Sequence, residues 1–100
     1  MARFDVHRGK TGRTPYLLDI QSDFLDQLDT RLVIPLLREG EMRGIIDRLH
    51  PRVAVEGERL VVATNLMASV RRAQLGGVVA SLASERDGII AAIDSLLQGF

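Results

Sequence analysis

The sequence predicts a small α+β domain that is mainly β and ends in a long helix. Before residue 75, most of the chain consists of short segments that alternate apolar and polar side chains or are apolar throughout, which is typical of strands. Residues 84–100 instead place their apolar side chains at helical spacing. The chain has 100 residues, the length of one domain, so we expect a single domain over 1–100.

The first expected strands lie close to the N-terminus. Phe4 and Val6 alternate with polar neighbours, which favours a half-buried strand. Residues 8–15 contain two glycines and a proline, a composition typical of a turn or loop. A second strand is predicted over Tyr16–Ile20, and the polar segment 19–29 is expected to cross the surface as a loop.

The middle of the chain predicts a buried strand and a short helix. Residues 32–37 (LVIPLL) are apolar throughout, as in a strand that is covered on both faces. Pro35 has no N–H to donate to a neighbouring strand, so we expect a sheet edge or a bulge there. Residues 39–49 space their apolar side chains as a helix does, although Gly44 weakens that prediction.

The remaining elements are a hairpin, a further strand and the C-terminal helix. Residues 53–63 predict a hairpin that turns at 56–58, and a strand is expected over 65–74. Ser84 is the expected N-cap of the helix, followed by acidic residues that suit its first turn. One face of this helix forms an apolar stripe made of Ile89, Ile93, Leu96, Leu97 and Phe100.

Composition excludes several classes of function. Thirteen basic and thirteen acidic residues give a formal net charge of zero, which argues against sequence-independent binding of nucleic acid. The absence of cysteine excludes disulfides, thiolate zinc sites and cysteine nucleophiles. Charged residues interrupt the first twenty positions, and no apolar run is long enough to span a bilayer. We therefore expect a cytoplasmic protein.

Isolated motifs predict neither an enzyme nor a cofactor or metal site. Gly9-Lys10-Thr11 has the ending of a phosphate-binding loop, but the earlier glycine that this motif requires is absent. His7 and His50 are too few for a zinc site without cysteine partners. Ser22, Asp23 and His7 allow a Ser–His–Asp arrangement, yet a serine in a polar loop is more often a turn residue.

Three stretches of the chain, residues 18–36, 49–70 and 75–100, resemble a known family of proteins. Within them stand, in the family's order and at nearly its spacing, the pieces DIQSD (19–23), VIPL (33–36), Leu49-His50-Pro51 and MASV (67–70). Together these pieces resemble the CcdB family, the toxins of type II toxin–antitoxin modules.

The resemblance implies both a fold and a function. The fold is a small SH3-like antiparallel barrel with a long C-terminal helix, shared with MazF-like toxins, and the protein is a homodimer. The implied function is that of a non-catalytic plasmid-maintenance toxin, which binds the A subunit of DNA gyrase and traps the gyrase–DNA cleavage complex. A CcdA-like antitoxin neutralises the toxin, and the two together bind operator DNA and repress their own transcription.

The resemblance also implies two sets of contact residues. The gyrase-binding positions are Ser22, Phe24, Asp94, Gln98, Gly99 and Phe100. Asp94 replaces an asparagine of the family, and Gln98 replaces a tryptophan, a residue type that often anchors interfaces. The expected antitoxin-binding positions are Arg3, Phe4 and His7 in the first strand, together with Arg8, Lys10 and Arg13, whose charges suit an acidic partner.

Two other functions remain open from the sequence. A MazF-like RNA endonuclease would require an arginine and a carboxylate or histidine to converge, and Arg13, Asp23 and His7 are the available set. A degenerate homologue without toxicity would bind only the antitoxin and act as co-repressor, because Gln98 offers neither the area nor the ring of tryptophan. We expect residues 67–70 to contribute to the dimer interface.

Overall fold

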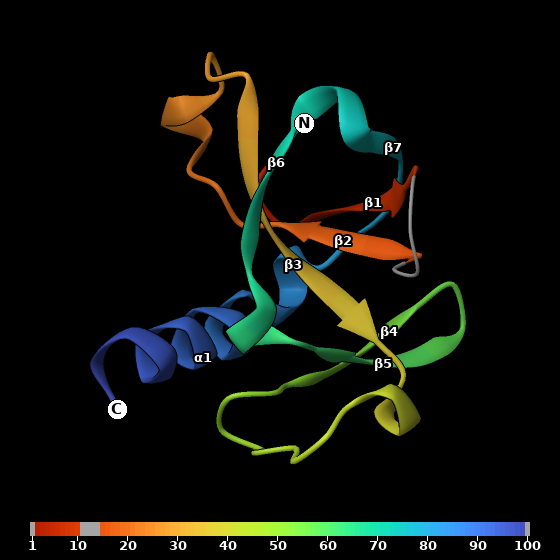
Figure 1. Cartoon of the computed structure of the whole chain (residues 1–100), viewed down its shortest axis with the longest axis vertical. Coiled ribbons are helices and arrows are strands. Elements are labelled where there is room, and N and C mark those ends of the chain that lie inside the picture. Colours follow the sequence, from red (N-terminus) through yellow and green to blue (C-terminus); the bar gives the residue numbers. More distant parts are fainter. Residues whose placement is uncertain (1, 11–14, 100) are drawn as a thin grey trace.

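A computed structural model of the chain describes residues 2–10 and 15–99, and within them the predicted mainly-β fold with a C-terminal helix is confirmed. One antiparallel sheet contains seven strands in the order β4-β5-β3-β2-β1-β7, and β6 pairs with β3 off this path. Figure 1 shows the sheet curving into a half-barrel with the helix α1 to one side. The elements are β1 Asp5–Gly9, β2 Tyr16–Asp19, β3 Thr30–Leu37, β4 Arg52–Val55, β5 Glu58–Val62, β6 Ala68–Arg71, β7 Leu75–Ser81 and α1 Arg86–Gln98.

β3 organises the sheet because it changes partner along its length. It pairs with β2 on one side, and on the other with β6 over Thr30–Val33 and then with β5 at Leu36 and Leu37. The sequence predicted a sheet edge or a bulge at Pro35. Pro35 lies instead between these two pairings. The missing N–H of proline is tolerated where no ladder bond is required, and the carbonyl of Pro35 still accepts from Ala63 N at 3.1 Å.

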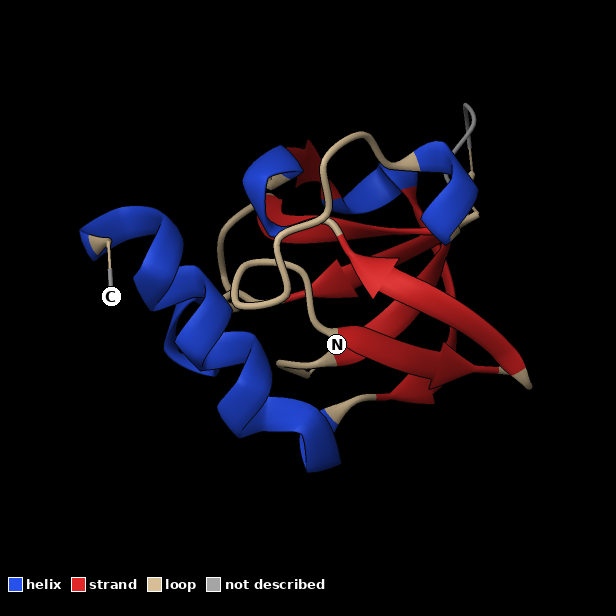
Figure 2. Ribbon diagram, turned by 90° about the horizontal axis from the view of Figure 1, so that it is seen from below, coloured by secondary structure: helices blue, strands red, loops and turns tan. Residues whose placement is uncertain are grey.

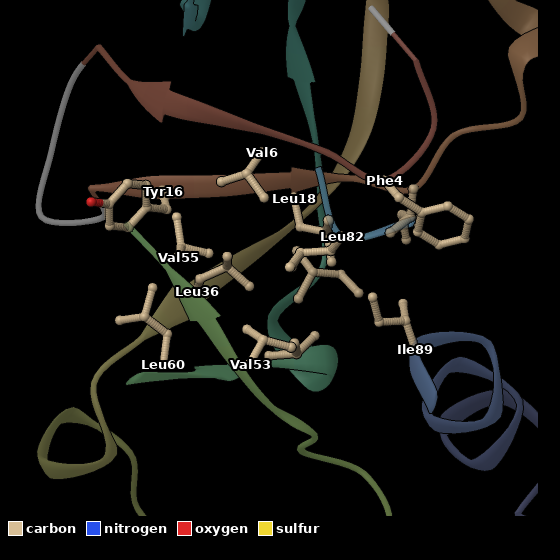
Figure 3. Close-up of a cluster of buried hydrophobic side chains, with 13 residues drawn as sticks. Phe4, Val6, Tyr16, Leu18, Leu36, Val53, Val55, Leu60, Leu82 and Ile89 are labelled. Atoms are coloured by element: carbon tan, nitrogen blue, oxygen red, sulfur yellow. The ribbon is translucent and has the colours of Figure 1, made fainter. Parts of the chain in front are cut away.

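The hydrophobic core lies between the concave face of the sheet and α1. Its members come from β1 to β5, from Phe4 and Leu82 beside the sheet, and from Ile89 of α1 (Figure 3). Burial of each such large apolar side chain contributes about 1.5–3 kcal/mol to folding. On β3 the adjacent residues Val33 and Ile34 are both buried, as expected for a strand covered on both faces.

α1 begins later and buries a narrower face than the sequence predicted. Ser84 lies in a 3-10 turn, η5 (Ala83–Glu85), and the helix starts at Arg86 without a side-chain cap. Ile89 and Ala92 are its buried residues, whereas Leu97 is 69% exposed. Figure 2 shows the helix lying against one side of the sheet, and no helix of the described residues has the length and hydropathy that a bilayer span requires.

Two further differences concern the middle of the chain and β7. Residues 39–49 form no α-helix but a 3-10 turn, η2 (Glu39–Glu41), followed by a bend at 43–44 and a turn at 47–49. Gly44 has a left-handed φ of 67°, which interrupts helical backbone. The strand expected over 65–74 is confined to β6, between the 3-10 turns η3 (Thr64–Leu66) and η4 (Arg72–Gln74). β7 was not predicted, because Gly76 and Gly77 lower its strand propensity.

Gly76 is nevertheless required by the packing of β7 against β1. A Cβ atom at this position would lie 2.8 Å from the carbonyl oxygen of Arg8. Side chains do not approach backbone oxygens so closely, so the two strands can pair here only through a glycine.

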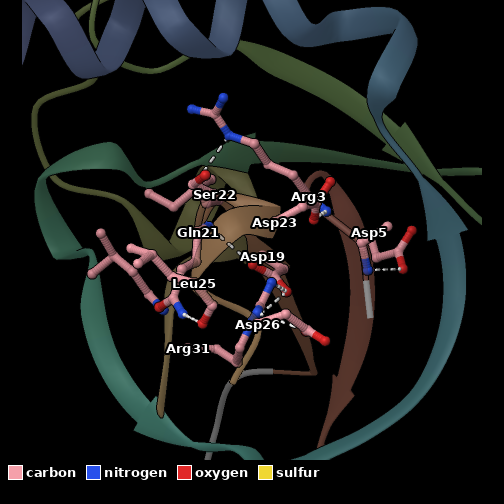
Figure 4. Close-up of polar contacts among 12 residues, drawn as sticks. Arg3, Asp5, Asp19, Gln21, Ser22, Asp23, Leu25, Asp26 and Arg31 are labelled. Atoms are coloured by element: carbon pink, nitrogen blue, oxygen red, sulfur yellow. Dashed lines mark hydrogen bonds and ion pairs between the residues drawn. The ribbon is translucent and has the colours of Figure 1, made fainter. Parts of the chain in front are cut away.

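A buried ion pair joins the ends of β2 and β3. Arg31 Nε donates to Asp19 Oδ2 at 2.9 Å and its Nη2 lies 2.7 Å from the same oxygen (Figure 4). Neither side chain is exposed to solvent. Arg31 Nη1 also donates to Asp26 at 3.2 Å, and Asp19 Oδ1 accepts from the backbone N–H of Gln21 at 3.0 Å. The pair therefore fixes the start of the segment that follows β2.

We expect Asp19→Ala to lower the free energy of unfolding by about 3–5 kcal/mol, because it leaves the buried guanidinium of Arg31 without its main counter-charge. Urea unfolding followed by circular dichroism measures this loss. Glu39→Ala is the control, since Glu39 belongs to an exposed pair with Arg52 at 2.5 Å and its removal should change stability little. Equal losses in the two variants would contradict a dominant role for the buried pair.

Candidate functional site

An open cavity of about 370 Å³ lies where the N-terminal segment, the 3-10 turn η1 (Asp23–Leu25) and the start of α1 meet. Its lining residues are Arg3, Phe4, Ser22, Asp23, Phe24 and Arg86. Four of these six were predicted as contact residues, two in the gyrase set and two in the antitoxin set. The fold thus brings parts of both sets to one cavity.

The η1 wall of the cavity is held by its own polar side chains. Ser22 caps the turn, since its Oγ accepts from Phe24 N at 3.3 Å. Asp23 Oδ1 accepts from the backbone N–H of Arg3 at 2.9 Å, which ties the turn to the N-terminal segment (Figure 4). Gln21 binds Leu32 N and Leu25 O, both at 3.0 Å. With its backbone fixed in this way, the turn presents the ring of Phe24 to solvent, 92% exposed.

The floor of the cavity is formed by a residue in an unusual conformation. Phe4 is not a glycine, yet it has a left-handed φ of 73°. Backbone hydrogen bonds hold it there, from Phe4 N to Asp19 O at 2.7 Å and from Leu82 N to Phe4 O at 2.8 Å. The conformation directs the ring of Phe4 into the core, where it is only 4% exposed. Such strained residues persist where the surrounding structure over-determines them, often at binding sites.

Two arginines line the cavity. Arg3 lies over the ring of Phe4, with 5.0 Å from its Cζ to the ring centroid, and its Nε donates to Ile20 O at 3.1 Å. Figure 4 shows the rest of its guanidinium extending toward the helix. Arg86 is the first residue of α1, and no motif in the sequence marks it as a site residue. Within residues 2–10 and 15–99, neither arginine forms an ion pair with a carboxylate.

The other gyrase-set residues lie at the far end of α1. Asp94, Gln98 and Gly99 are exposed along its C-terminal half, with Asp94 about 12 Å and Gln98 about 18 Å from Arg86 at 1.5 Å of rise per residue. Gly99 ends the helix with a left-handed φ of 81°, and its N–H binds Ser95 O at 2.9 Å. Phe100 lies outside the described residues. The structure therefore divides the gyrase set into a cavity group and a helix-end group.

The antitoxin set is also divided. His7 is 2% exposed, and its Nδ1 donates to Gly76 O at 3.0 Å, so this conformation keeps the imidazole away from a partner. Lys10 Nζ donates to Ala73 O at 3.1 Å. Arg8 is exposed and pairs with Glu56 at 2.9 Å. No motif in the sequence connects Glu56 with a site. Arg13 lies outside the described residues.

Of the residues proposed for RNA cleavage, the two that the structure describes, His7 and Asp23, bond to different parts of the fold. His7 bonds to β7, whereas Asp23 bonds to Arg3 at the cavity, and Arg13 is not among the described residues. Within the same described ranges, no group of three or more histidine and acidic side chains is placed to hold a metal ion.

β6 and the end of α1 present apolar side chains to solvent. β6 pairs only with β3, so its other edge is unpaired among the strands of the described residues, and Ala68 and Ser69 are exposed. α1 packs against η3, where Leu66 is 49% exposed, while Leu97 of the helix is 69% exposed. This face includes residues 67–70, which are expected from the sequence to contribute to a dimer interface.

A family model described as CcdB protein matches residues 3–99. The chain belongs to the CcdB family. Family membership and a fold that is also found in other toxins both support the conclusion that this protein is a toxin of a type II toxin–antitoxin module. A comparison with curated protein sequences gave no match.

Solved structures that share the fold include the following two. One is an endoribonuclease from a mycobacterial species in complex with its cognate antitoxin, with a TM-score of 0.80 and 14% identity over 97% of this chain and 94% of that chain. The other is the Mycobacterium tuberculosis toxin MazF-mt6, with a TM-score of 0.76 and 17% identity over 93% of this chain and 95% of that chain. The predicted SH3-like barrel with a C-terminal helix, common to CcdB and MazF toxins, is thereby confirmed as the fold.

Truncation of the two phenylalanines of the cavity should change the stability of the protein to very different extents. Phe24→Ala removes an exposed ring, so we expect the free energy of unfolding to stay within about 0.5 kcal/mol. Phe4→Ala removes a buried ring and should lower it by about 3–5 kcal/mol. Denaturant titration of both variants measures the difference. A large loss of unfolding free energy with Phe24→Ala would mean that this ring packs against the rest of the protein and is not free to contact a partner.

Proposed function

We propose that this CcdB-family protein binds the A subunit of DNA gyrase and traps the gyrase–DNA cleavage complex. The observation that carries the proposal is Phe24, 92% exposed on a hydrogen-bonded turn and at a position that the family resemblance assigns to gyrase contact. A large apolar ring held in water contributes favourable free energy when a partner covers it. Buried aromatic anchors of this kind supply much of the energy of protein interfaces.

The helix-end group supports the same proposal. Asp94, Gln98 and Gly99 are exposed, so a partner can contact them without unfolding α1. Gyrase contains two A subunits, and a twofold toxin dimer can meet a twofold partner through identical contacts. Trapping the cleavage complex requires only tighter binding to that conformation of gyrase than to others, so the toxin acts without catalysis.

A CcdA-like antitoxin is the proposed second partner, and operator DNA is bound only by the toxin–antitoxin complex. Arg8 and Lys10, at the C-terminal end of β1, offer basic side chains that suit an acidic segment, and Arg3 lines the cavity beyond the other end of the strand. The mycobacterial endoribonuclease of the same fold was solved in complex with its cognate antitoxin. The cavity joins Arg3 to Phe24, so the two partners would meet at a shared border.

We further propose a homodimer built on the face formed by β6, Leu66 and Leu97. The exposed apolar side chains of this face would be covered by a second copy. Light scattering at tens of micromolar should therefore give twice the mass of the chain, and Leu97→Glu should shift the mass toward one copy, with Leu28→Glu as the control on a different exposed leucine. A wild-type monomer at that concentration would contradict this interface.

Deletion of residues 98–100 should abolish gyrase poisoning and leave the fold intact, because these residues lie beyond the buried part of α1. A DNA-cleavage assay with purified gyrase measures poisoning, and circular dichroism measures the fold. The matched substitution is Gln98→Trp, which restores the residue typical of the family and should tighten gyrase binding by about 1–3 kcal/mol.

The same assays separate the competing functions. Gyrase poisoning that persists after the deletion would mean that another surface contacts gyrase. A Gln98→Trp variant that still fails to bind gyrase, while the antitoxin complex forms, would favour the non-toxic co-repressor. Degradation of single-stranded RNA by the purified protein without metal would contradict a non-catalytic toxin.

A further inference from the structure

The turn of the β4–β5 hairpin carries a glutamate in a strained conformation. Val55 pairs with Glu58, so Glu56 and Gly57 form a two-residue turn. Their φ angles are 51° and 79°, both left-handed. Turns of this kind favour asparagine, aspartate or glycine at the first position, and a longer side chain is disfavoured there. A glutamate at this position therefore calls for an explanation outside the turn.

The carboxylate of Glu56 fills a site made by two other strands. Arg8 Nη2 donates to its two oxygens at 2.9 and 3.2 Å, and the hydroxyl of Tyr16 donates to Oε1 at 2.7 Å. Arg8 of β1 and Tyr16 of β2 lie directly opposite each other in the sheet. The guanidinium also lies over the phenol ring, with its Cζ 5.8 Å from the centroid. A cation and a hydroxyl are thus already arranged around one carboxylate.

One part of the site is buried and fixed, and the other part is open to solvent. Tyr16 is 6% exposed as a residue, and Figure 3 shows its ring at the edge of the buried cluster with the hydroxyl directed away from it. The side chains of Arg8 and Glu56 are 55% and 39% exposed. An ion pair so open to water contributes little to stability, so its carboxylate can be exchanged for another at small cost.

We propose that Arg8 and Tyr16 form a binding site for a carboxylate of the antitoxin, and that Glu56 occupies this site until the acidic segment of the antitoxin displaces it. The inference rests on the proposed antitoxin partner and names the chemistry that this partner brings. Lys10, two residues along the chain from Arg8, provides a second cation for a neighbouring acidic side chain. Glu56 then competes with the partner for Arg8 and Tyr16. An acidic partner displaces Glu56 from this site, and a weakly charged partner does not.

The sequence provides a direct readout of the site, because Tyr16 is its one tyrosine and tryptophan is absent. The hydrogen bond to Glu56 favours the neutral phenol and raises the pKa of Tyr16 above its ordinary value. Glu56→Gln should therefore move the phenol titration, followed by ultraviolet absorbance, down toward the ordinary value of about 10. An unshifted titration in this variant would overturn the geometry on which the proposal depends.

Binding is tested with a peptide probe of alternating glutamate and leucine that contains no tyrosine or tryptophan, and with its glutamine counterpart. Glu56→Gln should bind the acidic peptide about two- to sixfold more tightly than the wild type, because the internal competitor is gone. Arg8→Ala should weaken binding, and combining it with Glu56→Gln should remove the gain. The acidic peptide should also change the fluorescence of Tyr16 in the wild type, and the glutamine peptide should not.

Glu58→Gln is the matched control. Glu58 lies in the same hairpin and pairs with Arg38 at 2.5 Å, so this variant makes the same change in net charge without removing a hydrogen bond to Arg8 or Tyr16. Equal gains for the two variants would reduce the effect to net charge and overturn the proposal, as would a Glu56→Gln variant with no gain. Neither assay uses gyrase, so failure to poison gyrase would leave this result standing.

Discussion

The ion pair between Arg31 and Asp19 is the constraint on which the rest of the structure depends. Two charges withdrawn from water are tolerated only when each is well matched, and here both oxygens of the carboxylate have donors. The pair lies where β2 ends and β3 begins, and Asp26 extends it into the loop between them. The position of η1, and with it the exposed ring of Phe24, is thus determined by the interior of the protein.

Several elements were predictable because local patterns decided them. The hairpin follows from Gly57 between two apolar segments, and α1 follows from its helical spacing. The other elements depend on contacts between residues that are far apart in the sequence. Nothing near Pro35 in the sequence shows that β3 exchanges β6 for β5 at that point. The two glycines of β7 argue against a strand, and only the pairing with β1 explains why Gly76 stands there.

The candidate site was predictable to a similar extent. Ser22 and Phe24 could be named because they stand within or beside a motif that resembles the family. Arg86 has no such signal, and its place at the cavity results from the folding of α1 toward the N-terminal segment. Strand alternation correctly separated His7 from the core face that holds Val6, but it could not show that the second face of β1 is covered as well.

The close contact at Gly76 has a consequence for how this protein can vary. A Cβ atom there would meet the carbonyl oxygen of Arg8, the residue whose guanidinium pairs with Glu56. Any side chain at position 76 would have to push the β1 backbone away from β7 and so shift Arg8 relative to Tyr16. The placement of the Arg8 side chain is therefore coupled to the absence of a side chain at position 76. Variants with a side chain at position 76 are expected to have a wider spacing between β1 and β7 there.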